Sequence, residues 1–162
     1  MTETDIEARF AAACVIAREA GGLALSYFRD FTSLTVEIKD DHSEVSEADP
    51  AVEKLIGDRL AALFPDDAFF GEETGASGLD GDAPGIWVVD PIDGTACFVA
   101  GIPVWCVSIA YVRGGEIEIG VIFDPNAGEM FTVHRGWGAH LNGDPIRCSP
   151  ATGFSDGMVG IG

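Results

Sequence analysis

The first third of the chain has the hydrophobic spacing of two helices. Over residues 5–29 apolar side chains recur every three or four positions, which predicts a long amphipathic helix. Gly21-Gly22 lies inside this helix and allows either a kink or the close approach of another element. A second helix is predicted from Asp49-Pro50, because aspartate is a good N-cap and proline suits the first helical position. Its apolar face consists of Val52, Leu55, Ile56, Leu60 and Leu63.

From residue 66 onward the pattern changes to short apolar stretches separated by turn residues, which predicts strands. The turn signals are Gly114-Gly115, residues 126–128 and Asn142-Gly143. Two helices followed by connected strands predict an α+β fold in which the N-terminal helices pack on a largely antiparallel sheet. We expect residues 1–162 to form one domain or a substantial piece of a larger one. The predicted strands cover residues 34–38, 67–71, 85–90, 104–112, 116–124 and 129–134.

Composition narrows the functional classes. Hydrophobic residues make up 47% of the 162 positions, enough for a folded core, and 27 acidic against 9 basic side chains give a net charge of −18. This balance argues against nucleic-acid binding, because no basic stripe is available to displace counterions from a phosphate backbone. No apolar run has the length of a signal peptide or a membrane span. The four cysteines form no CxxC pair, which favours reduced thiols in a cytoplasmic protein.

Acidic residues gather at the starts and ends of the predicted elements, where loops can bring side chains to one rim of the sheet. Carboxylates converging there would repel one another by roughly 1–4 kcal/mol per close pair, and their pKa values would rise unless cations were bound. Hard oxygen ligands without histidine or cysteine favour Mg²⁺ over Mn²⁺ or Ca²⁺. We therefore expect a magnesium site among the acidic residues Asp49, Glu72, Glu73, Asp90 and Asp93.

Gly94-Thr95 follows these aspartates directly and suggests a second function for the rim. If residues 94–99 begin a short helix, its free N–H groups and its dipole would bind a phosphate, with the Thr95 hydroxyl at the same point. A carboxylate-held metal beside a phosphate-sized anion site suits metal-assisted phosphoester hydrolysis. The metal would lower the pKa of a bound water, which would become the nucleophile.

Two other interpretations of this stretch fail on spacing. Phosphatases of the haloacid dehalogenase type carry a nucleophilic aspartate in D-x-D-G-T, whereas Pro91 stands two positions before Asp93. An EF-hand loop beginning at Asp90 would need an aspartate or asparagine at Ile92 and an acid at Gly101. The sequence at this strand therefore matches neither class.

Two motifs together resemble the inositol monophosphatase family of Mg²⁺-dependent, Li⁺-sensitive phosphatases: G-E-E-T at 71–74 and W-V-V-D-P-I-D-G-T at 87–95. Lys39, the helix start at Asp49 and the segment G-W-G-A-H-L-N-G-D-P-I at 136–146 are similar to further landmarks of the family. The resemblance implies a layered α/β sandwich, a small phosphorylated substrate and a homodimer. It also implies two or three Mg²⁺ ions in a complete chain, with Mn²⁺ as a substitute.

The same resemblance implies roles for individual residues. Glu72, Asp90 and Asp93 would bind metal through their side chains, and Ile92 through its carbonyl. Asp49 and Thr95 would orient and deprotonate the attacking water, and Glu73 would support a metal-bound water. The phosphate would be received by the backbone of residues 93–95. The residues implied to contact substrate are Glu72, Ile92, Asp93, Gly94 and Thr95.

The sequence departs from the family pattern in two places. Ala96-Cys97-Phe98 stands where T-N-F is common, and none of the three tryptophans begins the later W-D-x-x-A segment that supplies a further aspartate ligand. We therefore expect an N-terminal portion of a family member, with the C-terminal half absent. Such a portion would bind one Mg²⁺ tightly at most and would be weakly active or inactive by itself.

The sequence as a whole predicts a Mg²⁺-dependent phosphomonoesterase in which a metal-activated water attacks a small phosphorylated polyol such as inositol 1-phosphate. Histidinol phosphate, sugar bisphosphates and nucleotide 3′-phosphates are alternative substrates. A non-catalytic metal-binding or dimerisation scaffold is the alternative outside the enzymes. Neither a nucleic acid nor a membrane is expected as a partner.

Overall fold

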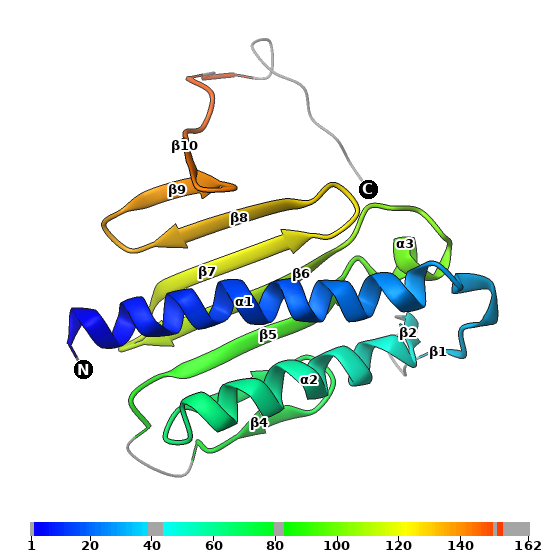
Figure 1. Cartoon of the computed structure of the whole chain (residues 1–162), viewed down its shortest axis with the longest axis horizontal. Coiled ribbons are helices and arrows are strands. Elements are labelled where there is room, and N and C mark those ends of the chain that lie inside the picture. Colours follow the sequence, from blue (N-terminus) through cyan, green and yellow to red (C-terminus); the bar gives the residue numbers. More distant parts are fainter. Residues whose placement is uncertain (1, 39–43, 80–82, 151, 154–162) are drawn as a thin grey trace.

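The computed structural model describes residues 2–38, 44–79, 83–150 and 152–153, so Lys39 lies outside the described residues. Two long helices, α1 (Glu3–Phe28) and α2 (Ala48–Leu63), run antiparallel across one face of a sheet (Figure 1). They are joined by the 3₁₀ turn η1 (Phe31–Ser33) and by a small hairpin of β1 (Val36–Ile38) and β2 (Glu44–Ser46). The two predicted helices are therefore confirmed. No helix in the described part of the chain is long and apolar enough to span a membrane.

The sheet has eight strands in the order β10-β9-β8-β7-β6-β5-β3-β4. Only the neighbours β3 and β5 run parallel, and the other pairs of this sheet are antiparallel, which confirms the predicted, largely antiparallel sheet. A short helix, α3 (Thr95–Val99), follows β5. The strands are β3 (Ala68–Gly71), β4 (Gly75–Ser77), β5 (Ile86–Asp93), β6 (Cys106–Arg113), β7 (Glu116–Asp124), β8 (Glu129–His134), β9 (Gly138–Leu141) and β10 (Asp144–Ile146).

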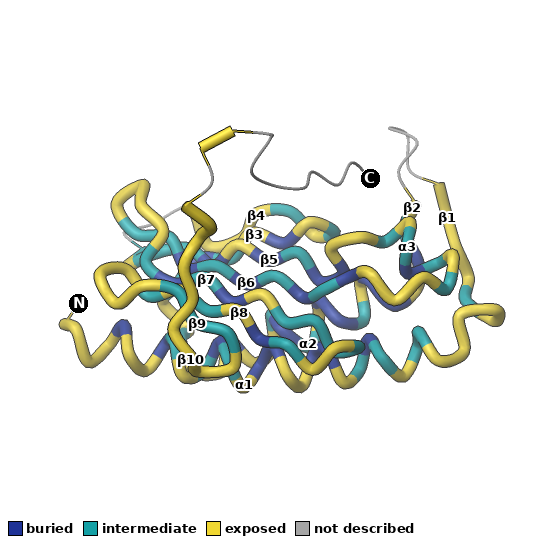
Figure 2. The backbone as a smooth tube through the Cα atoms, turned by 90° about the horizontal axis from the view of Figure 1, so that it is seen from above, coloured by how far each residue is buried: buried dark blue, intermediate teal, exposed yellow. Residues whose placement is uncertain are grey.

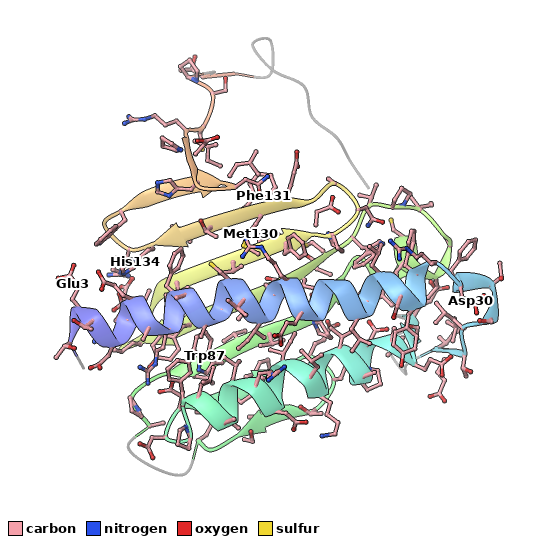
Figure 3. The ribbon with its side chains drawn as sticks, viewed as in Figure 1. Glu3, Asp30, Trp87, Met130, Phe131 and His134 are labelled. Carbon is pink, nitrogen blue, oxygen red and sulfur yellow. The ribbon has the colours of Figure 1, made fainter. Side chains whose placement is uncertain are left out.

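The hydrophobic core lies between the helices and the sheet, as the tube seen from above shows (Figure 2). Helix α1 contacts β6 and β7, and α2 contacts β5. Alternation along the strands decides which side chains enter this layer: in β8, Met130 is 2% exposed and its neighbour Phe131 is 37% exposed (Figure 3). The opposite face of the sheet consequently presents exposed apolar side chains, namely Phe70, Val88, Ile122, Phe131 and Val133.

Gly21 explains how closely α1 approaches the sheet. A Cβ atom at this position would lie 2.6 Å from the Phe123 ring of β7, whereas a Cβ at Gly22 would meet nothing within 4 Å. The glycine pair therefore serves close packing through its first member, because only a residue without a side chain leaves room for the ring.

The predicted start of the second helix needs correction. Helix α2 begins at Ala48 with Glu47 at the N-cap position, so Asp49 is a residue of the first turn and the N-cap prediction is wrong. The Asp49 carboxylate instead accepts hydrogen bonds from the backbone and hydroxyl of Ser46, at 2.8 and 2.7 Å. Its side chain thus bonds back to the residue before the helix, and one oxygen is left to serve another element.

Candidate metal and phosphate site

The parallel pair β3 and β5 brings the acidic motifs together. Gly71 at the end of β3 pairs with Val89, and the backbone N–H of Glu72 donates to the Val89 carbonyl at 3.0 Å. Glu72 leaves β3 at this point and Asp90 follows Val89 within β5, so the parallel pairing sets Glu72 and Asp90 side by side. The predicted end of the strand at residue 90 is wrong, because β5 continues to Asp93; the parallel pairing nonetheless makes the two acidic motifs neighbours.

Asp90 has an unusual environment for a carboxylate. Its Oδ1 atom is buried and has no hydrogen-bond partner. Burial, followed by the neighbouring Glu72 and Asp93 carboxylates, raises the pKa of Asp90 to about 7. A partly buried anion beside two like charges is costly without a cation, and the backbone N–H of Ile92 offsets this cost only in part. Asp90 therefore has the properties of a metal ligand rather than of a turn residue.

A register shift in β5 places Asp93 beside Glu72 and Asp90, and these three residues form the acidic rim of the sheet. The pairing with β6 is irregular between Asp90 and Asp93, so Asp93 emerges opposite Cys106 and its carboxylate is exposed. The Cys106 thiol lies 3.8 Å from Asp93 Oδ2, and burial, followed by the Asp93 charge, raises the pKa of Cys106 to about 12. This thiol is therefore neutral at physiological pH.

Asp49 and Thr95 are brought together because α3 contacts β2, the strand that leads into α2. The Thr95 hydroxyl lies 3.2 Å from Asp49 Oδ1 and 3.0 Å from the Ile92 carbonyl oxygen. A hydroxyl has one proton, so Thr95 donates to one acceptor at a time and keeps a lone pair that can accept from water. Burial raises the pKa of Asp49, against the lowering effect of the hydrogen bonds from Ser46.

Gly94 allows the sharp turn between the aspartates and α3. It has φ +101°, in the left-handed region, and a Cβ here would lie 3.0 Å from the Val104 carbonyl oxygen. The turn places the first residues of α3, whose N–H groups have no partner within the helix, next to Asp93. The expected helix over residues 94–99 is thus confirmed, with Gly94 as its N-cap.

The rim suits a hard cation that is only partly coordinated by protein. Among the described residues, no three side chains of His, Cys, Asp or Glu are grouped so that they could hold an ion by themselves. The available donors are nonetheless the oxygen atoms that Mg²⁺ prefers, and Mg²⁺ normally keeps several waters. The buried Oδ1 of Asp90, which has no hydrogen-bond partner, is an oxygen atom that a Mg²⁺ ion could bind, so the structure supports a metal site independently of the motif.

Sequence reasoning missed Glu53. This residue of α2 is 1% exposed, and its carboxylate accepts hydrogen bonds from the backbone N–H groups of Glu73 and Thr74. A signal was available: Glu53 is a charged residue next to Val52, on the face of the helix predicted to be apolar. The Glu73 side chain itself borders a cavity of about 370 Å³ that is also lined by Ser46 and Pro50.

The described histidines lie away from this rim. His134 stacks on the rings of Phe10 and Trp137. His140 belongs to β9, which is separated from β5 by β8, β7 and β6 in the sheet. Both histidines lie in strands of the sheet and not among the acidic residues.

The comparisons with known proteins agree with this architecture. The model of the inositol monophosphatase family matches residues 5–160. The chain belongs to the inositol monophosphatase family. It is 42% identical over 137 residues to a histidinol-phosphatase of Chlorobaculum parvum, covering 83% of this chain and 51% of that protein. It is 37% identical over 144 residues to an inositol-1-monophosphatase of Rhizobium meliloti, covering 89% and 54%.

A solved structure shows the same fold. The extragenic suppressor protein suhB from Bartonella henselae superposes with a TM-score of 0.85 at 35% identity, over 89% of this chain and 55% of that one. The chain spans about half the length of the curated relatives it matches. The family and the fold implied by the two motifs are therefore confirmed, while the activity of a whole protein is a matter of proposal.

Proposed function

We propose that the complete protein is a Mg²⁺-dependent phosphomonoesterase. The observation that carries the proposal is Asp90, a carboxylate with a buried, unpartnered oxygen beside Glu72 and Asp93. Membership of a phosphatase family, with relatives named inositol-1-monophosphatase and histidinol-phosphatase, supports it.

The proposed metal ligands are the carboxylates of Glu72, Asp90 and Asp93 and the carbonyl of Ile92. When bound, Mg²⁺ would supply charge to the phosphate oxygens and a more acidic water. The chain's own part begins at Thr95, whose hydroxyl accepts from the attacking water and donates its proton toward Asp49 Oδ1. A buried Asp49 with a raised pKa is a better proton acceptor than an exposed aspartate. Glu73, at the edge of the adjoining cavity, would support a water bound to the metal.

The phosphate is proposed to lie against Asp93, Gly94 and Thr95 at the start of α3, and the substrate is a small phosphorylated polyol such as inositol 1-phosphate. The names of the two relatives make histidinol phosphate the first comparison. The proposal includes a cytoplasmic homodimer. It also includes two or three Mg²⁺ ions in the complete chain, and weak or absent activity for residues 1–162 alone.

The test is turnover of the complete protein on a panel of these phosphates. Thr95→Ala should lower turnover by roughly 10²–10⁴, the range of general-base assistance, and leave metal affinity nearly unchanged. Asp93→Asn should lose both. Thr152→Ala, at an exposed threonine, is the matched control. Equal turnover in Thr95→Ala and the parent would contradict the proposed roles. A parent that binds metal but hydrolyses no phosphate of the panel would favour a non-catalytic scaffold.

A further inference from the structure

Glu53 is a buried carboxylate whose partners are backbone amides. It is 1% exposed, and none of the ion pairs between described residues includes it. Its Oε2 accepts from the N–H of Glu73 at 2.8 Å and its Oε1 from the N–H of Thr74 at 2.9 Å. Each carboxylate oxygen of Glu53 thus accepts one backbone N–H of the same turn.

The two amides belong to the turn that carries the rim carboxylates. This turn leaves β3 at Gly71 and carries Glu72 and Glu73 before the chain enters β4. Hydrogen bonds from two consecutive N–H groups to one carboxylate hold both the position and the direction of a turn. The exposed Glu72 is the residue directly before the first of these amides.

The strand is shaped to admit Glu53. A Cβ added at Gly71 would lie 2.4 Å from the carboxyl carbon of Glu53, so no other residue fits without displacing the side chain. Gly71 has no left-handed φ, and its need for glycine comes from this close approach alone.

Helix α2 also holds the start of α3 through a carboxylate, that of Asp49. Asp49 lies four residues before Glu53, one turn along the same side of the helix, and its Oδ1 receives the Thr95 hydroxyl. One rigid helix therefore bonds to the turn after β3 through one carboxylate and to the start of α3 through another. The distance between these two loops is set by a single helical turn.

We propose that Glu53 is a positioning residue that holds the Glu72–Glu73 turn in register with the Asp49–Thr95 pair. This inference rests on the proposed function, because the turn matters only if Glu72 binds metal. Residues that orient metal ligands without touching the metal typically change metal affinity by 10–100-fold when they are altered.

The experiment measures Mn²⁺ affinity by electron paramagnetic resonance in the complete protein. Glu53→Gln keeps the size of the side chain but turns an NH₂ donor toward one of the two N–H groups. We expect Mn²⁺ affinity to fall 10–100-fold, and hydrogen exchange in the peptide over residues 72–75 to accelerate. Glu19→Gln, which removes one exposed charge paired with Arg59 of α2, is the control and should leave both unchanged. Glu53→Asp keeps the charge on a shorter side chain, and its Mn²⁺ affinity and hydrogen exchange should lie between those of Glu53→Gln and the parent.

The outcomes separate the two proposals. A parent that binds no Mn²⁺ overturns the proposed function and this inference with it. A parent that binds, together with a Glu53→Gln protein of equal affinity, overturns the inference alone, even if exchange of the turn is faster. If Glu53→Gln does not fold, Glu53→Asp decides by the same two measurements: weaker affinity with faster exchange supports the inference, and parental affinity overturns it.

Discussion

Asp67 and Asp90 lie at opposite ends of the parallel pair β3–β5, and the protein surrounds these two carboxylates very differently. Asp67 precedes β3, and its side chain is 0% exposed. It receives the Arg9 guanidinium through Nε at 2.8 Å and Nη2 at 2.9 Å, Trp87 Nε1 at 3.1 Å, and the Tyr111 hydroxyl at 3.1 Å. The Arg9 guanidinium also lies over the rings of Phe64 and Tyr111.

At the other end of the pair, Asp90 Oδ1 is buried with no donor, and the charged neighbours are Glu72 and Asp93. Asp67 stands just before β3, whereas Asp90 lies within β5, directly after the last residue that pairs with β3, and only the Asp67 carboxylate is neutralised by the chain itself. The difference teaches that burial of an acid does not by itself indicate function. A buried acid indicates function when the described residues around it include no positive charge, as at Asp90.

The largest expected effect comes from breaking the satisfied end. Asp67→Asn should lower the free energy of unfolding by about 3–5 kcal/mol, because it leaves the Arg9 charge buried without its partner. Urea unfolding measures this. The control is Asp58→Asn at the exposed Lys54–Asp58 pair, which should change stability by no more than about 0.5 kcal/mol. A loss at Asp67 as small as that of the control would mean that the pair contributes no net stability.

Adding Mg²⁺ should make the unsatisfied end resemble the satisfied one. Mg²⁺ at one hundred times its dissociation constant should raise the free energy of unfolding by about 2.7 kcal/mol, because only the folded protein assembles the site. Thermal unfolding with and without a chelator measures the shift. Na⁺ at equal ionic strength is the control, because it screens charges without filling the site. An equal shift with Na⁺ would point to general screening.

Asp90→Asn should have the opposite sign to Asp67→Asn. In the metal-free protein above pH 7, where Asp90 is charged, the substitution removes the repulsion from Glu72 and Asp93. The free energy of unfolding should therefore rise by about 1 kcal/mol, a value kept small by solvent screening of a partly exposed carboxylate. The variant should also lose most of the stabilisation by Mg²⁺. Unfolding of both proteins in chelator and in Mg²⁺ gives the full comparison, and a destabilised metal-free variant would show that the hydrogen bond from the Ile92 N–H to Asp90 outweighs the repulsion.

Tyr111→Phe should have the smallest effect, with a distinct pH dependence. Burial, followed by the Asp67 charge, raises the pKa of Tyr111 to about 12, above its ordinary value near 10. The folded state therefore favours the protonated hydroxyl, and this stability is present below pH 10 and is lost as pH rises from about 10 to 12. Tyr111→Phe should cost about 0.5–1 kcal/mol at pH 8 and flatten the alkaline loss. Tyr27→Phe, at the other tyrosine, is the control; a parallel alkaline loss in Tyr111→Phe would assign it to other groups.

Much of this architecture follows from the sequence because it depends on local pattern. The strands over residues 116–124 and 129–134 have the predicted bounds, since alternation and turn glycines act within a few residues. Gly94-Thr95 marks the start of α3 for the same reason, and the two motifs identify the family without any coordinates.

Only the tertiary structure decided which of the acidic residues are satisfied. The sequence contains no sign that Asp67 meets Arg9, which is 58 positions away, or that Asp49 serves Thr95, 46 positions away, instead of capping its helix. For Glu53 the sequence shows only a charge on an apolar helix face, and its partners, the N–H groups of Glu73 and Thr74, come from the turn after β3. The physical reason is that charge compensation and hydrogen bonding act across space. The acidic motif that contains Asp90 can be recognised in the sequence. That its Oδ1 is buried without a hydrogen-bond partner can be seen only in the folded chain, where the parallel strands β3 and β5 lie side by side.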